Sequence, residues 1–164
     1  MNIKQLHSEL NELFERWAKR PAKSVQPLNA HGSDRKYFRL ENSSQKAIGV
    51  YNSDRRENIA FLNFSKHFLH KGLNVPEIYA QELDKNIYLE QDLGDLTLFD
   101  YLSEVRTKEG FLDKIIHLYE KIIEQLPRFQ IGAKEGLDFS LCYPRHSFDR
   151  QSMMWDLNLS LIHI

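Results

Sequence analysis

The sequence predicts an α+β fold in two parts, a five-stranded antiparallel sheet with one helix followed by a helical region. Segments with alternating apolar and polar residues recur between residues 24 and 92, and a single helical pattern separates the third from the fourth. After residue 96 the periodic segments have helical spacing. Between the two parts, residues 87–95 begin as an apolar strand, carry acidic residues and break at Gly94.

Length and composition fit one globular domain. The chain has 164 residues, of which 41% are hydrophobic and 27% charged, with a net charge of −1. This balance gives no electrostatic reason to expect a nucleic-acid or membrane partner. The single cysteine, Cys142, excludes an internal disulfide, and the N-terminus lacks the apolar core of a signal peptide. We therefore expect a cytoplasmic protein, whose oligomeric state the sequence does not determine.

The beginning of the chain predicts one helix and a hairpin. Apolar residues at helical spacing predict an amphipathic helix over residues 2–19, which Pro21 ends. A weak strand at 24–28 and an alternating strand at 36–41 flank a polar turn, residues 29–35. This turn is either an ordinary hairpin loop or a nest whose backbone N–H groups approach phosphates.

The next segments complete the sheet. Residues 47–51 are expected to form the third strand, and residues 75–80 and 86–90 the last two. Asp54 and Glu57 have the spacing of a capping box, which predicts a helix from about Asp54 to Lys71. Gly72 follows, where a C-terminal cap belongs.

The helical region is predicted to hold three helices. A short helix is expected over 97–104, and a wide apolar stripe from Phe111 to Leu126 indicates a second helix that packs in a core. Residues 128–145 are expected to be a loop, and Ser147 to cap the last helix. No His, Cys, Asp or Glu residues have metal-ligand spacing, so no metal site is predicted.

Four segments together resemble the N-terminal part of aminoglycoside-phosphotransferase-like kinases. The likeness is greatest to the bacterial branch that phosphorylates N-acetylmuramate and N-acetylglucosamine at the anomeric hydroxyl. The matching segments are 32–40, 57–62 with 72–78, 88–95 and 148–157. The resemblance covers roughly residues 1–157, which corresponds to about half of a complete enzyme of this family.

The resemblance implies a domain organisation. Residues 1–92 would be the nucleotide-binding small lobe of a protein-kinase-like fold, with its leading helix. Residues 93–96 would be the hinge, and residues 97–157 the start of a helical large lobe. Residues 158–164 do not resemble the family and are expected to be a non-native end of a truncated chain.

The resemblance also implies ligands and site residues. The complete protein would use ATP and Mg²⁺ to phosphorylate a sugar hydroxyl, with the hinge backbone holding adenine. The residues implied to bind the nucleotide are Gly32, Ser33, Asp34, Arg35, Lys36, Ile48, Glu57, Glu90, Gln91, Asp92 and Leu93. Those implied to face the sugar are Asp149, Trp155 and Asp156.

Two departures from the family leave alternatives open. The third strand lacks the usual lysine, so phosphate orientation falls to Arg35 or Lys36 or is lost. Glu57 either pairs with the phosphate-orienting cation or is only a capping partner. The family's His-x-Asp catalytic loop and metal-binding Asp are missing, so no catalytic residue is assigned. We expect the chain alone to be inactive, and the alternative function is a silent nucleotide-binding or protein-interaction module.

Overall fold

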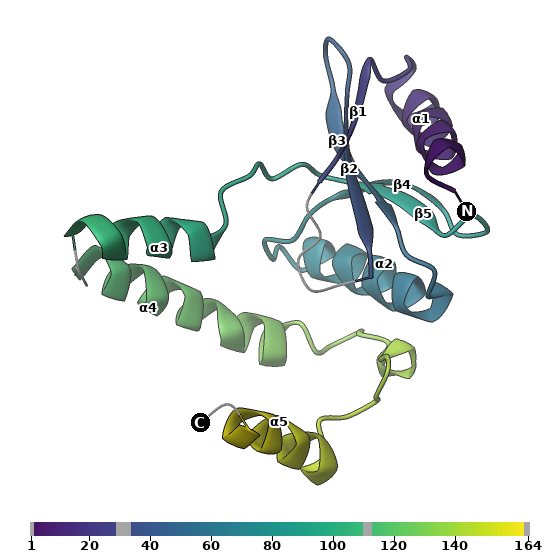
Figure 1. Ribbon diagram of the computed structural model, residues 1–164. Helices are drawn as coiled ribbons and strands as arrows, with labels where there is room; N and C mark the ends of the chain where they lie inside the picture. The colour runs from purple at the N-terminus through teal and green to yellow at the C-terminus, as the bar shows by residue number, and fades with distance from the viewer. Residues whose placement is uncertain (1, 29–33, 110–112, 163–164) are drawn as a thin grey trace.

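The computed structural model describes residues 2–28, 34–109 and 113–162, and it confirms the predicted antiparallel sheet (Figure 1). Five strands lie in the order β1-β2-β3-β5-β4, and each pairs antiparallel with its neighbours. The strands are β1 (Ser24–Pro27), β2 (Lys36–Glu41), β3 (Lys46–Tyr51), β4 (Ile78–Glu82) and β5 (Ile87–Glu90). β4 begins at Ile78 rather than at the predicted residue 75.

Helix α1 (Ile3–Ala18) covers one face of the sheet. The side chain of Asn2 accepts a hydrogen bond of 2.8 Å from the N–H of Gln5, which caps the helix start. Apolar residues recur at helical spacing and therefore form one buried stripe against the strands. The buried residues of this core are Leu6, Leu10, Leu13, Phe14 and Ala18 of α1 with Phe38, Leu40, Ala47, Ile87 and Leu89 of the sheet.

Gly49 lies where α1 approaches β3 closely. A Cβ atom at this position would be 2.6 Å from Cδ1 of Leu40 and 3.0 Å from Cδ2 of Leu10. Because both leucines would have to move, Gly49→Ala is expected to lower the free energy of unfolding by about 2 kcal/mol. Urea denaturation measures this change, with Gly132→Ala as the control, since the nearest contact of a Cβ there is 4.0 Å away. Equal midpoints for the two variants would contradict the close packing.

Helix α2 (Arg55–His70) packs on the opposite face of the sheet (Figure 1). Leu62 is buried there against Ile48, Val50 and Tyr88. The helix ends as predicted, because Gly72 has a φ of +72° and the N–H of Leu73 bonds to the carbonyl of Phe68 at 3.0 Å. The predicted helix between the third and fourth strands is therefore confirmed.

The rest of the chain is helical. Figure 1 shows α3 (Leu98–Glu109) and α4 (Asp113–Pro127) side by side and antiparallel, with α5 (Arg150–Ile162) beyond them. The predicted loop 128–145 instead contains a π-helical turn at Arg128–Gly132 and a 3₁₀ turn at Phe139–Leu141. None of the helices in the described residues is both long and apolar enough to cross a membrane.

Two predictions for the helical region need correction. Asp149 rather than Ser147 caps α5, since its Oδ1 atom accepts a hydrogen bond of 2.9 Å from the N–H of Ser152. Of the predicted core stripe, Phe111 and Leu112 lie outside the described residues, and Ile115 is buried against Leu102 and Val105 of α3. The stripe also includes exposed residues, which are Ile116, Ile122, Ile123 and Leu126. They are exposed because α3 packs along only one side of α4.

Candidate functional site

The candidate site begins where β5 ends. In the sheet register, Ile48 of β3 lies opposite Arg39 of β2 on one side and opposite Glu90 of β5 on the other. Side chains in such a cross-strand row share one face of the sheet, and Ile48 packs in the core on the α2 side. The predicted nucleotide-site residues Ile48 and Glu90 are therefore direct neighbours.

Glu90 is a buried carboxyl group with an incomplete set of partners. Its exposed fraction is 9%, and its Oε2 atom has no hydrogen-bond partner within the described part of the chain. Burial raises its pKa from the usual 4.5 to about 7, although the nearby charge of Arg35 acts in the opposite direction. The carboxyl group is therefore poised to change charge near neutral pH.

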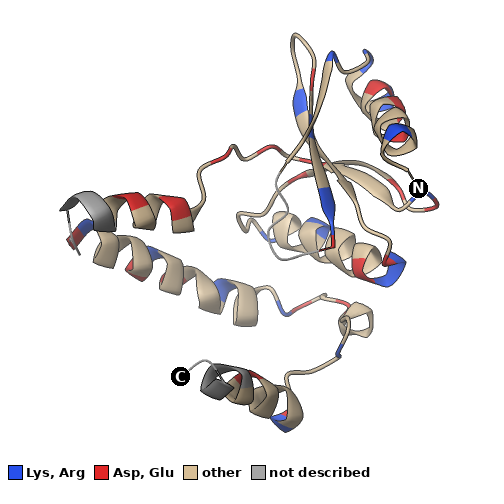
Figure 2. Ribbon diagram, viewed as in Figure 1, with Lys and Arg blue, Asp and Glu red and all other residues tan. Residues whose placement is uncertain are grey.

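An ion-pair cluster braces the connection between β5 and α3, residues 91–97, which carries acidic residues (Figure 2). The guanidinium group of Arg39 donates to Asp92 at 2.8 and 3.1 Å and to Asp95 at 2.8 and 3.2 Å. Burial alone would raise the pKa of Asp92, but hydrogen bonds from Arg39 and from the N–H of Gly94 hold it below its usual value. Arg39 thus ties the connection to the second strand.

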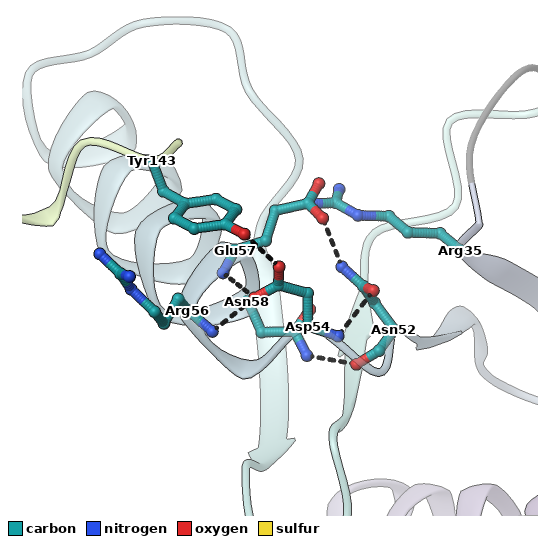
Figure 3. Close-up of polar contacts among 7 residues, drawn as sticks. All are labelled: Arg35, Asn52, Asp54, Arg56, Glu57, Asn58 and Tyr143. Carbon is teal, nitrogen blue, oxygen red and sulfur yellow. Dashed lines mark hydrogen bonds and ion pairs between the residues drawn. The ribbon is translucent and has the colours of Figure 1, made fainter. Parts of the chain in front are cut away.

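Arg35 forms an ion pair with Glu57 of α2 (Figure 3). Its guanidinium Nη2 lies 2.8 Å from Oε1 of Glu57 on α2 and its Cζ lies 4.8 Å from the centroid of the Phe61 ring. β3 begins with Lys46, one residue earlier than predicted, and this lysine alternates with Ile48 and Val50 but pairs with Asp92 at 3.5 Å. Strand alternation puts Lys36 on the other face of β2, where it is exposed. The structure therefore joins Arg35, and not Lys36, to Glu57.

The surroundings of Glu57 bear on its two predicted roles. Asp54 does cap α2, because its Oδ1 accepts hydrogen bonds from the N–H groups of Arg56 and Glu57 at 2.9 and 3.1 Å. The N–H of Asp54, which a capping box would direct to Glu57, instead donates to Oδ1 of Asn52 at 3.0 Å. The Glu57 carboxylate accepts from Arg35 and from Nδ2 of Asn52, each at 2.8 Å. The side chain of Glu57 therefore forms an ion pair with Arg35 and does not complete a capping box.

The other implied nucleotide residues are only partly brought together. Gly32 and Ser33 lie outside the described residues, while Asp34 is exposed just before Arg35. The N–H of Gln91 donates to the carbonyl of Glu77 at 2.9 Å and so extends the pairing of β5 with the β4 side. Leu93 is 68% exposed.

Two of the three implied sugar-facing residues line one cavity. Trp155 and Asp156 of α5 border a cavity of about 820 Å³, together with Tyr143 and Arg145 of the preceding loop. The Arg145 guanidinium lies over the Trp155 ring, 4.6 Å from its centroid. Asp149 is not part of this lining and instead caps α5. Its pKa is lowered, chiefly by its hydrogen bonds from Ser152.

Sequence reasoning missed three residues of these clusters. Arg39 has a signal in the sequence, because it alternates with Arg35 and Tyr37 and so shares their face of β2. Asn52 and Tyr143 have no signal in the sequence. Their contacts depend on how the turn before α2 and the distant loop before α5 pack against α2. Within the described ranges, no three or more His, Cys, Asp or Glu side chains are grouped to hold a metal ion.

Comparison with known proteins relates the chain to sugar kinases. It is 26% identical over 157 residues to an N-acetylmuramate/N-acetylglucosamine kinase of Pseudomonas putida, covering 82% of this chain and 46% of that protein. It is 29% identical over 128 residues to the protein of the same name from Pseudomonas aeruginosa, covering 76% and 36%. The chain thus spans half or less of the length of these curated relatives. No protein-family model matches it.

Proposed function

We propose that this chain is the nucleotide-binding part of an ATP-dependent phosphotransferase that acts on an amino-sugar hydroxyl. The observation that carries the proposal is the ion pair between Arg35 and Glu57, 2.8 Å long, at the start of α2. In kinases a cation held by a helix carboxylate orients the phosphates. The strand order, with α2 inserted between β3 and β4, is compatible with a kinase-like small lobe, and the names of both relatives agree with it.

The nucleotide would lie along the α2 face of the sheet. Its base would approach Ile48 and the connection 91–97, where the carbonyl of Gln91 and the backbone of Leu93 are the groups to meet adenine. Its phosphates would approach Arg35, whose side chain is 13% exposed. Because Arg39 and Lys46 already contact Asp92, this carboxylate acts by bracing the connection rather than by contacting ATP.

The acceptor would occupy the cavity beside α5. An indole ring can stack on the apolar face of a sugar, and a carboxylate can accept hydrogen bonds from its hydroxyl groups. Trp155 and Asp156 provide these two groups in the 820 Å³ cavity, and the relatives are named for N-acetylmuramate and N-acetylglucosamine. We assign the sugar to this cavity.

We expect this chain to bind ATP but not to catalyse phosphoryl transfer. Transfer of the γ-phosphoryl group needs a base and metal ligands, and the sequence contains no match to the His-x-Asp loop and metal-binding Asp that supply them in the family it resembles. We therefore expect the 164-residue chain to bind ATP without phosphorylating either sugar. The alternative, a protein-interaction module, predicts no ATP binding.

Amide chemical shifts recorded during an ATP titration test the proposal. Residues 90–94 and Arg35 are expected to shift at millimolar ATP, and the Trp155 indole at millimolar N-acetylglucosamine. Matched assays for sugar phosphorylation are expected to show no product. Unchanged shifts at 90–94 and Arg35 would refute the nucleotide site, and an unchanged Trp155 signal would refute the sugar site.

A further inference from the structure

A tyrosine of the helical region reaches the start of α2 (Figure 3). The hydroxyl of Tyr143 donates a hydrogen bond of 2.6 Å to Oδ2 of Asp54, 89 residues away in the chain. The guanidinium of Arg56 lies over the Tyr143 ring, 5.0 Å from its centroid. Tyr143 thus connects the loop before α5 to the first turn of α2.

This contact leads directly to the Arg35–Glu57 pair. The carboxylate of Asp54 binds the Tyr143 hydroxyl through Oδ2 and the backbone N–H of Glu57 through Oδ1. The side chain of Glu57 then meets Arg35 at 2.8 Å. A single carboxylate therefore lies between the tyrosine and the glutamate that holds the cation.

We propose that Tyr143 is a positioning residue whose hydroxyl holds the first turn of α2 in the orientation in which Glu57 meets Arg35. The role of that pair in holding phosphates rests on the function proposed above. Tyr143 also lines the cavity beside α5. It therefore connects the wall of the proposed sugar cavity with the proposed phosphate-orienting pair.

The hydroxyl matters because it completes the cap. The hydrogen bond from Tyr143 is the largest cause of the lowered pKa of Asp54, so it favours the charged carboxylate. By holding Oδ2, the hydroxyl also fixes the side chain in the orientation in which Oδ1 accepts from the N–H groups of Arg56 and Glu57. Without the hydroxyl, the first turn of α2 is expected to open more often and to release Glu57 from Arg35.

Tyr143→Phe tests this role without any ligand. The variant keeps the ring that Arg56 covers and removes only the hydroxyl. We expect a higher pKa of the Asp54 carboxyl by ¹³C titration, faster hydrogen exchange at the N–H of Glu57, and altered guanidinium ¹⁵N signals of Arg35. Tyr119→Phe, in α4, is the matched control and should leave all three readouts as in the wild type.

Measuring ATP and adenosine binding to the same variant separates this inference from the proposed function. Tyr143→Phe is expected to weaken ATP binding about fivefold and to leave adenosine binding unchanged. An unaltered Arg35 signal in Tyr143→Phe would overturn the positioning role, even if the Asp54 pKa moves, because the hydroxyl would then be only a local contact. If the ligand-free readouts respond as expected but ATP binds to neither protein, the positioning role stands and the nucleotide proposal fails.

Discussion

Replacing Arg35 with glutamine is expected to weaken ATP binding by about tenfold to a hundredfold and to leave adenosine binding within about twofold. Arg35 is held by Glu57 and by the face of Phe61, so its charge is fixed in place before a phosphate arrives. Glutamine removes that charge and the planar donor set. Isothermal titration calorimetry with ATP and adenosine measures the two affinities.

Arg55→Gln is the matched control for this substitution. Arg55 also lies at the start of α2, but it pairs at 3.2 Å with Asp84, whose side chain is 91% exposed. Such a surface pair contributes little, so ATP binding should be unchanged. Equal losses of ATP and adenosine affinity in Arg35→Gln would indicate damage to the fold, and full ATP affinity would refute the phosphate role of Arg35.

The sheet and α2 could be predicted because their signals are local. Alternation within 36–41 and the apolar run 47–51 identified the two strands, which then pair residue by residue in the structure. Asp54 and Gly72 marked the ends of α2 to within one or two residues. These features depend on backbone preferences of a few neighbouring residues, so they do not require knowledge of the tertiary fold.

The site was less predictable because it depends on contacts between distant segments. The sequence left the phosphate-orienting role to Arg35, to Lys36 or to neither, and only the face of β2 on which α2 packs determines that Arg35 is the one that meets Glu57. The prediction that Ser147 caps α5 was wrong for a related reason. Ser147 and Asp149 are both good capping residues, and the path of the preceding loop determines that Asp149 is the cap.

The second strand contributes to both ends of the proposed nucleotide site. Arg35 precedes β2 and meets Glu57 at one end, and Arg39 meets Asp92 and Asp95 at the other. Their even spacing puts both guanidinium groups on the α2 face of the strand. A movement of β2 would therefore displace the phosphate-orienting pair and the connection 91–97 together.

Glu90 should make the stability of the protein depend on pH in the neutral range. Its pKa rises from the usual 4.5 to about 7 on folding, which corresponds to about 3 kcal/mol. A raised pKa favours folding while the carboxyl is protonated in both states, below about pH 4.5. This contribution is lost as the pH rises through 7. The unfolded carboxyl ionises freely above about pH 4.5, whereas the folded protein must either keep the proton on Glu90 or bury a charged carboxylate.

Glu90→Gln is therefore expected to match the wild type near pH 4 and to be more stable by about 3 kcal/mol at pH 8. Glutamine resembles the protonated carboxyl and does not ionise. Other carboxylates also affect stability in acid, so the quantity to measure is the difference in unfolding free energy between variant and wild type at each pH. Glu77→Gln, an exposed neighbour just before β4, is the control. A difference that does not change between pH 4 and 8 would show that the pKa of Glu90 is the same in the folded and unfolded states, and would refute the raised pKa. A difference that changes in the opposite direction would show that the buried environment stabilises the carboxylate instead of the acid.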